Sequence, residues 1–104
     1  MITAERAREI ANIFLAEEVN AQPQFEGITG EITRFDEHRF GWVFFYQSST
    51  WVKTRDINDA WMGHGPVLID RRDGSVHALG SARPEEDMAR FQSRYDAETI
   101  QKDR

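Results

Sequence analysis

The chain has 104 residues, of which 12% are aromatic and none is cysteine, and it carries a formal net charge of −5. This length has room for one core, so we expect a single domain over residues 1–104; the lack of cysteine excludes disulfides, thiolate catalysis and cysteine-based zinc sites. The negative charge disfavours nucleic acid and anionic membranes as partners and favours encounter with a basic protein surface, although simple solubility explains it as well.

The first predicted element is a helix from about Thr3 to Asn20. Thr3 is a suitable N-cap, and apolar residues recur on one stripe at helical spacing. The stripe consists of Ala7, Ile10, Ala11 and Phe14. Pro23 disfavours helical geometry before it and therefore marks the end of the helix. Glu17 and Glu18 lie near this end, where the helix dipole disfavours carboxylates, so these charges are candidates for a role outside the helix.

Four strand candidates follow. Residues 28–35 are rich in β-branched side chains. The segment FGWVFFYQSS, residues 40–49, is apolar at nearly every position of its first half, which predicts a central strand covered on both faces. PVLID, residues 66–70, and SVHALG, residues 75–80, are the third and fourth candidates. Asp73-Gly74 between them is a strong signal for a hairpin turn, so we expect antiparallel pairing.

The segment between the second and third strands, residues 48–65, is predicted to be irregular. One helical turn is expected over Ile57–Trp61, with Asp56 as its cap. The sequence GHGP at residues 63–66 ends the segment. Glycine permits positive φ at one or both of its positions, and proline restricts the backbone where the third strand begins. We interpret GHGP as a rigid corner that holds the preceding loop in one shape, and not as a reactive site.

The last predicted helix begins at Pro84, and three acidic residues that follow it complement the helix dipole. Its apolar stripe consists of Met88, Phe91 and Tyr95. The tail from Glu98 to Arg104 is expected to fray. The predicted fold class is α+β, with an N-terminal helix, a four-stranded antiparallel sheet and a C-terminal helix. Two short helices are expected to cover only one sheet face, which leaves part of the other face to residues 48–65.

Few residues are candidates for catalysis or metal binding. His38, His64 and His77 are 26 and 13 residues apart, whereas a helical metal site needs two histidines at a spacing of about four. His64, with Asp56 and Asp59 nearby in sequence, is the best candidate for acid–base chemistry. No Gly-x-Ser-x-Gly elbow and no glycine-rich phosphate loop accompanies it. We therefore expect no enzymatic activity, no metal and no cofactor.

Trp51 and Trp61 leave two interpretations open. Tryptophan is usually largely buried, so both side chains can complete the core beneath the sheet; it is also enriched at interface hot spots, so both can contact a partner. The charged residues around them are then the better candidates for specificity. The predicted partner-binding residues are Glu17, Glu18, Asp36, Glu37, Trp51, Asp56, Asp59, Trp61 and His64.

The N-terminal segment contains charged residues where a secretory signal would need an apolar run. Glu5 and Arg6 come before such a run could reach the length of a signal-peptide core, and no later stretch approaches a membrane span. We therefore expect a cytoplasmic protein that does not bind membranes.

Three ordered motifs between Phe40 and Ala82 resemble the immunity protein 35 family, also called the YrhB-like domain. They are Gly41-Trp42 followed by the aromatic strand, Gly63-x-Gly65-Pro66 followed by an apolar strand, and Asp73-Gly74. The resemblance implies a bacterial α+β protein, encoded beside a polymorphic toxin, that binds and neutralises this toxin in the producing cell. It further implies a toxin that is often papain-like, a cysteine peptidase or deamidase, and it carries no catalytic residues onto this chain.

Three functions remain as hypotheses. The first is a stoichiometric inhibitor, itself a monomer or weak homodimer, that docks an acidic surface on a basic toxin one-to-one and covers the toxin's active site. The second is a general chaperone-like module that binds many unfolded proteins through exposed aromatic side chains. The third, which has the least support, is a small hydrolase that uses His64.

Overall fold

The computed structural model describes residues 1–20, 22 and 27–102. Helix α1 (Ala4–Phe14) begins after the predicted cap, where the Thr3 hydroxyl accepts a hydrogen bond from the Arg6 amide at 3.1 Å. The helix continues as one π-helical segment, η1 (Leu15–Val19). The apolar stripe on α1 and η1 faces the sheet. In any other orientation, the helix would bury its polar face and expose this stripe to solvent. The predicted N-terminal helix is confirmed.

The sheet contains four antiparallel strands in the order β1-β2-β3-β4. They are β1 (Gly30–His38), β2 (Gly41–Ser48), β3 (Val67–Asp70) and β4 (Val76–Ala78). The pairing of β1 with β2 shifts register between Ile32 and Arg34, which marks a β-bulge. β2 is central and almost wholly buried, as its continuous apolar sequence predicts, whereas β1 is a largely exposed edge strand. The predicted α+β class, with an N-terminal helix, a four-stranded antiparallel sheet and a C-terminal helix, is confirmed.

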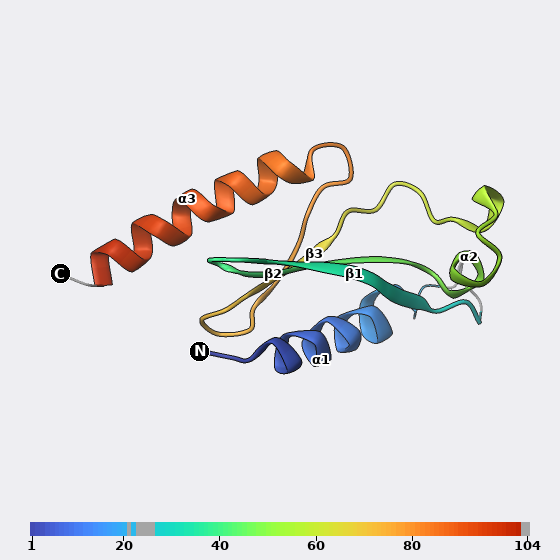
Figure 1. Cartoon of the computed structure of the whole chain (residues 1–104), viewed down its shortest axis with the longest axis horizontal. Helices are drawn as coiled ribbons and strands as arrows, with labels where there is room; N and C mark the ends of the chain where they lie inside the picture. Colours follow the sequence, from blue (N-terminus) through green and yellow to red (C-terminus); the bar gives the residue numbers. More distant parts are fainter. Residues whose placement is uncertain (21, 23–26, 103–104) are drawn as a thin grey trace.

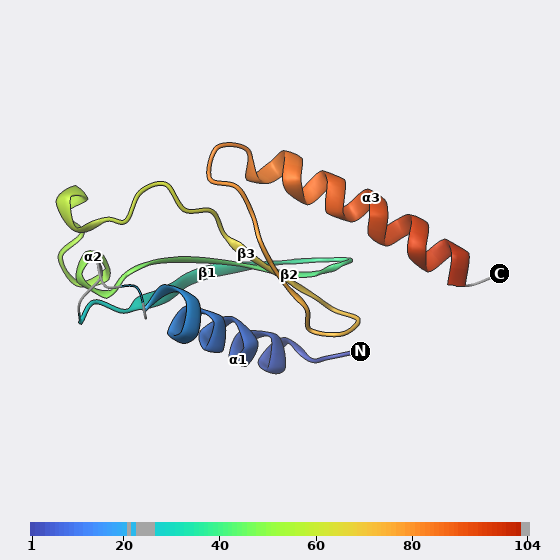
Figure 2. The ribbon, with the colours of Figure 1, turned by 180° about the vertical axis from the view of Figure 1, so that it is seen from behind.

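The two long helices cover opposite faces of the sheet (Figures 1 and 2). Side chains alternate across β2, so Phe44 packs toward α1 and Val43 packs toward α3 (Pro84–Lys102). The α1-side core consists of Ala7, Ala11, Leu15, Val19, Trp42, Phe44, Tyr46, Val67 and Ile69. The α3-side core consists of Phe40, Val43, Leu68, Phe91 and Tyr95. The expectation that both helices cover one face is wrong, because a strand that is apolar on both faces needs a cover on each.

Arg72 connects the turn between β3 and β4 to helix α3. Its guanidinium donates to the buried Asp70 carboxylate at 2.7 and 3.1 Å and to Glu98 of α3 at 2.6 Å. It also lies 4.6 Å from the centre of the Tyr95 ring. The hydrogen bonds to Asp70 and Glu98 raise the pKa of Arg72 above its ordinary value. α3 continues through Glu98 to Lys102, so the expected fraying from Glu98 onward is wrong over the described part of that tail.

No helix in the described ranges combines the length and the apolar character that crossing a bilayer requires.

Candidate protein-docking surface

The segment between β2 and β3 forms two short helices at the end of the molecule opposite the N-terminus and the last turns of α3 (Figure 1). Helix α2 (Ser49–Thr54) was not predicted; its cap is Ser48, whose hydroxyl accepts from the Trp51 amide at 3.0 Å. The 3-10 turn η3 (Ile57–Asp59) is capped by Asp56, whose carboxylate accepts from the Asn58 amide at 2.9 Å. This second turn is the one that the sequence predicts.

Two consecutive side chains at the end of β2 hold this segment in place. The Gln47 amide group accepts from the Trp61 backbone N–H at 2.9 Å and donates to the Trp61 carbonyl at 3.0 Å. The Ser48 hydroxyl, which is 0% exposed, also donates to the Asp59 carbonyl at 2.6 Å. Because buried polar groups are costly when unpaired, these bonds favour one conformation of the segment.

The GHGP corner closes the segment and uses its two glycines for different reasons. Gly63 has a φ of +79°, which side chains other than glycine rarely adopt, although a Cβ at this position would meet no other part of the chain within 4 Å. Gly65 lies against the end of β4, where a Cβ would be 2.0 Å from the Leu79 carbonyl oxygen. The corner therefore brings the segment close to the end of β4.

An aromatic cavity of about 400 Å³ lies beneath the corner. The His64 ring stacks on Tyr46 with a centroid distance of 4.3 Å and meets Trp61 edge-on at 6.5 Å. The cavity is lined by Val19, Gln22, Tyr46, Ala60, Trp61, Met62, Gly63 and His64. The Nε2 atom of His64 is buried and has no hydrogen-bond partner among the described residues. Neither Asp56 nor Asp59 bonds this imidazole, so the acid–base pairing considered for His64 does not form within the described chain.

Burial raises the pKa of the Tyr46 phenol above its ordinary value of 10.0. The unfolded chain therefore ionises this phenol at lower pH than the folded chain does, and the stabilisation is complete below pH 10 and lost as pH rises through the folded pKa. In a titration of tyrosinate absorbance, Tyr46 is expected to ionise above its ordinary pKa of 10.0, and we call this change the late step. We expect Tyr46→Phe to remove the late step. The chain has only two tyrosines, so Tyr95→Phe is the matched control, and the late step must persist in it. A late step that survives in Tyr46→Phe would contradict this assignment.

The structure brings five of the nine predicted partner-binding residues together in the segment from α2 to the corner. These are Trp51, Asp56, Asp59, Trp61 and His64. Trp61 is half-buried and packs against the α1-side core, which fits the core interpretation of this side chain. Trp51 is half-buried, with the Arg55 guanidinium 4.4 Å above its ring. The Asp59 carboxylate accepts from the Thr54 hydroxyl at 2.5 Å, so it already has a structural partner.

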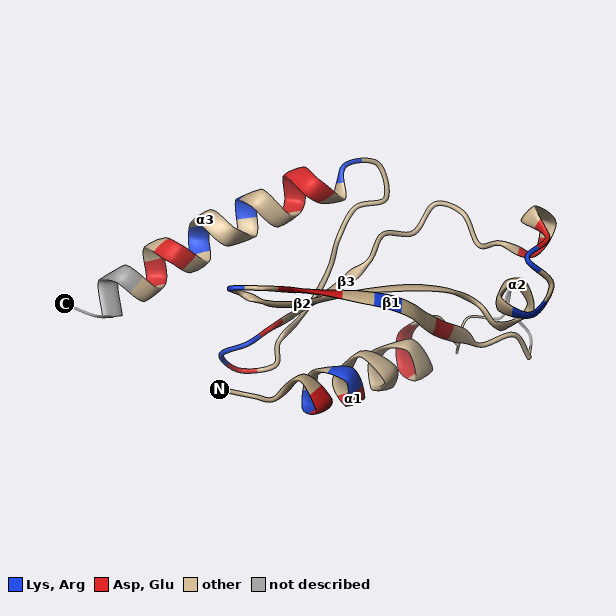
Figure 3. Cartoon of the chain, in the orientation of Figure 1, with Lys and Arg blue, Asp and Glu red and all other residues tan. Residues whose placement is uncertain are grey.

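The other four predicted residues lie elsewhere. Glu17 and Glu18 are exposed on η1 and line a groove of about 570 Å³ between α1 and β4. Asp36 and Glu37 are exposed on β1 opposite Val43 and Trp42, which are five and six residues along β2 from Ser48, or roughly 17–20 Å away. Figure 3 shows acidic and basic residues interspersed along the ribbon. The nine residues therefore do not form one continuous acidic surface.

Two exposed apolar residues of the same segment were not predicted as contact residues. Ile57 is 65% exposed and Met62 is 71% exposed. Large apolar side chains in a segment otherwise rich in polar residues are the sequence signal that identifies them. We call Trp51, Ile57, Met62 and His64, together with the exposed carboxylate of Asp56, the β2–β3 surface.

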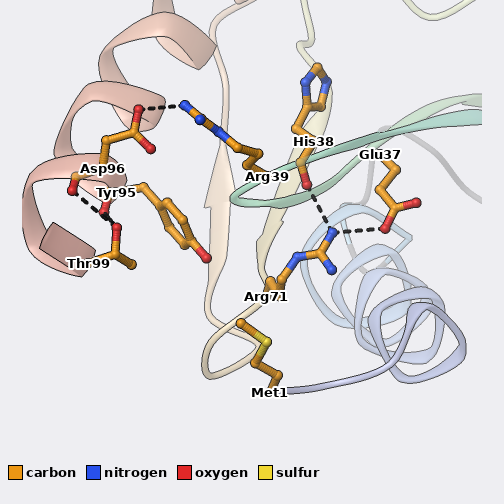
Figure 4. A pocket seen from close by; sticks show the side chains of 8 residues that line it. All are labelled: Met1, Glu37, His38, Arg39, Arg71, Tyr95, Asp96 and Thr99. Atoms are coloured by element: carbon orange, nitrogen blue, oxygen red, sulfur yellow. Dashed lines mark hydrogen bonds and ion pairs between the residues drawn. The ribbon is translucent and has the colours of Figure 1, made fainter. Parts of the chain in front are cut away.

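A second cleft, of about 810 Å³, lies between α3 and the turns of the two hairpins (Figure 4). Its charged side chains pair with one another: Arg71 donates to Glu37 at 2.8 Å, and Arg39 donates to Asp96 at 2.8 Å. Arg71 also donates to the His38 carbonyl at 3.0 Å. These bonds join β1, the β3–β4 turn and α3, which gives the cleft a structural role. Nowhere in residues 1–20, 22 and 27–102 do three histidine or carboxylate side chains gather as a metal site requires.

Comparison with known proteins identifies relatives of the chain. The family model described as Immunity protein 35 matches residues 5–98. The uncharacterized protein YrhB of Escherichia coli (strain K12) is 34% identical over 47 residues, which are 45% of this chain and 50% of that protein. The aligned part thus spans about half the length of this curated relative. No solved structure matches the chain.

Proposed function

This chain belongs to the immunity protein 35 family, and on that premise we propose that it neutralises a cognate bacterial toxin by docking the β2–β3 surface over the toxin's active site. The observation that supports this site is a segment held by Gln47 and Ser48 that exposes Ile57 and Met62. A segment that is ordered before binding loses less conformational entropy on association. Exposed methionine and half-buried tryptophan also suit the apolar centre of an interface.

The net charge of the whole chain favours a toxin with a basic rim around its active site. The chain has a net charge of −5, and the exposed Asp56 carboxylate lies within the β2–β3 surface. Opposite charge at the rim accelerates association more than it strengthens the final complex. We propose a one-to-one complex with a toxin of papain-like fold, formed in the cytoplasm of the producing bacterium, with residues 1–104 acting as one domain of a polymorphic toxin system and performing no catalysis.

Truncation of the surface tests this proposal. We expect calorimetric titration with the toxin encoded by the neighbouring gene to give one site, and Met62→Ala and Trp51→Ala each to weaken binding roughly 10- to 30-fold, as central interface residues do. Ile13→Ala is the matched control, because Ile13 is an exposed apolar residue on α1 outside the β2–β3 surface. Loss of binding in Ile13→Ala but not in Met62→Ala would place the docking site at the groove between α1 and β4 instead.

A general chaperone-like activity is the second candidate. The groove between α1 and β4 favours it, because Ile13 and Val76 line this groove and are both exposed. This activity predicts weak binding to many unfolded chains and protection of an unrelated enzyme from aggregation. Absence of protection at concentrations that saturate the toxin would exclude it.

A further inference from the structure

The outer edge of β1 is open in the described structure. β1 pairs only with β2 in the strand order, and five consecutive residues, Thr33 to Glu37, are exposed. An edge strand presents a row of backbone N–H and C=O groups that can pair with another strand. Phe35, in the middle of this stretch, is 47% exposed, so the edge also carries a large apolar side chain.

Opposite charges flank Phe35 along the strand. Arg34 and Asp36 lie one residue to either side of it, opposite Phe45 and Val43 of β2, and so share the face that α3 covers. The Arg34 guanidinium lies 4.0 Å from the Phe45 ring, and neither Arg34 nor Asp36 forms an ion pair with a described residue. Phe35 points to the opposite face, where its ring lies 5.6 Å from that of Phe44.

The geometry of antiparallel pairing restricts how two copies of this edge can meet. In an antiparallel pair, two facing residues either exchange backbone hydrogen bonds with each other or both lack them. Along one edge of a strand these two kinds of residue alternate. When the two strands are copies of β1, two residues that face each other must therefore have sequence numbers that differ by zero or by an even number. One allowed register places Arg34 opposite Arg34 of the partner subunit, and another places Asp36 opposite Asp36 of the partner subunit. The register between them places Phe35 opposite itself and pairs Arg34 with Asp36 of the partner subunit in two symmetric ion pairs.

We propose that two copies of this chain associate through β1 in this last register and join their four-stranded sheets into one continuous sheet. The bulge between Ile32 and Arg34 limits regular pairing to the part of the strand that ends at His38, so the dimer is weak and depends on concentration. The strands are antiparallel, so the two β2–β3 surfaces point in opposite directions. Each remains free, and the dimer does not depend on the proposed toxin contact.

A charge exchange tests the register. Arg34→Asp and Asp36→Arg each place like charges opposite one another at two symmetric positions, and each is expected to raise the dimer dissociation constant about tenfold or more in sedimentation equilibrium. The double variant Arg34→Asp/Asp36→Arg restores opposite charges and is expected to return the dissociation constant to within about twofold of the original. Glu85→Arg makes the same charge change as Asp36→Arg, at an exposed position on α3, and is the matched control. It is expected to leave the dimer dissociation constant unchanged.

Single cysteines test the same register by a second route, because the natural chain has none. Phe35→Cys places the two thiols directly opposite and is expected to form a disulfide-linked dimer rapidly under mild oxidation. Glu37→Cys, on the same face of the strand, separates the two thiols by about 13 Å and is expected to cross-link slowly.

Several results would overturn the proposal. These are a monomer at every concentration, equal cross-linking of Phe35→Cys and Glu37→Cys, or a folded double variant that stays as weakly associated as the single variants. Weaker toxin binding by Arg34→Asp without any dimer in the original protein would show instead that β1 pairs with a strand of the toxin. Met62→Ala must leave dimerisation unchanged, so failure of the toxin proposal and failure of the dimer proposal are distinguishable.

Discussion

Replacing Gly65 with alanine is expected to lower the free energy of unfolding by about 3 kcal/mol or more. The new Cβ would lie 2.0 Å from the Leu79 carbonyl oxygen and 2.6 Å from the Gly80 carbonyl oxygen. Both atoms belong to the backbone, so no side-chain rotation relieves the contact. The chain after β4 has to move away from the corner, and the hydrogen bond from the Leu79 amide to the Pro66 carbonyl, 2.9 Å long, is strained or broken.

Gly63→Ala is the matched control for this variant. Gly63 is two residues earlier in the same corner and has positive φ, but its surroundings leave room for a Cβ. The expected loss is therefore only the backbone strain, about 1–2 kcal/mol. Urea unfolding of the two variants separates close contact from backbone strain. Equal losses at the two positions would contradict the explanation given for Gly65.

The second large effect is expected at Asp70. Its carboxylate is 2% exposed and accepts from the Arg72 backbone amide at 2.8 Å as well as from the Arg72 guanidinium. Asp70→Asn removes the charge that compensates this guanidinium, whose side chain is only 24% exposed. We expect a loss of about 3 kcal/mol, at the lower end for breaking a buried pair, because Arg72 retains Glu98 and some contact with water.

Glu98→Gln is the control, because Glu98 bonds the same guanidinium from the exposed side. An exposed ion pair contributes about 0–1 kcal/mol, so this variant is expected to have little effect on thermal or chemical unfolding. If Glu98→Gln were as destabilising as Asp70→Asn, burial of Asp70 would not be the reason for the effect. Since Arg72 also contacts Tyr95, Asp70→Asn is expected to increase proteolytic cleavage in α3.

Local sequence patterns predicted most of the fold because they report local physical preferences. The stripe on α1, the Asp73-Gly74 turn and the capped turn at Asp56 each depend on residues close together in the chain. Helix α2 escaped prediction because STWVKT is rich in β-branched and polar residues. Its signal was Ser48, whose hydroxyl serves both as the helix cap and as a bond to Asp59.

The placement of the helices and of the candidate surface depends on distant contacts. The apolar run in β2 already required cover on both faces, but only the packing of Phe91 and Tyr95 assigns α3 to the second face. Shared negative charge is the reason that the sequence groups Asp36 and Asp56 as candidates for one surface. In the structure, Asp36 lies opposite Val43, whereas Asp56 lies beyond the Ser48 end of β2, so much of the length of the sheet separates them. The exposure of Met62 follows from the GHGP corner, whose shape depends on the approach of Gly65 to β4.

β2 contributes side chains to both hydrophobic cores, Phe44 to one and Val43 to the other. Either helix can leave its face only by exposing apolar side chains of the strand that also anchors the opposite helix. We therefore expect that neither half persists alone and that unfolding is one cooperative transition. A destabilising substitution in β2 is therefore expected to weaken both hydrophobic cores. It is also expected to weaken the β2–β3 segment, which Gln47 and Ser48 of this strand hold in place.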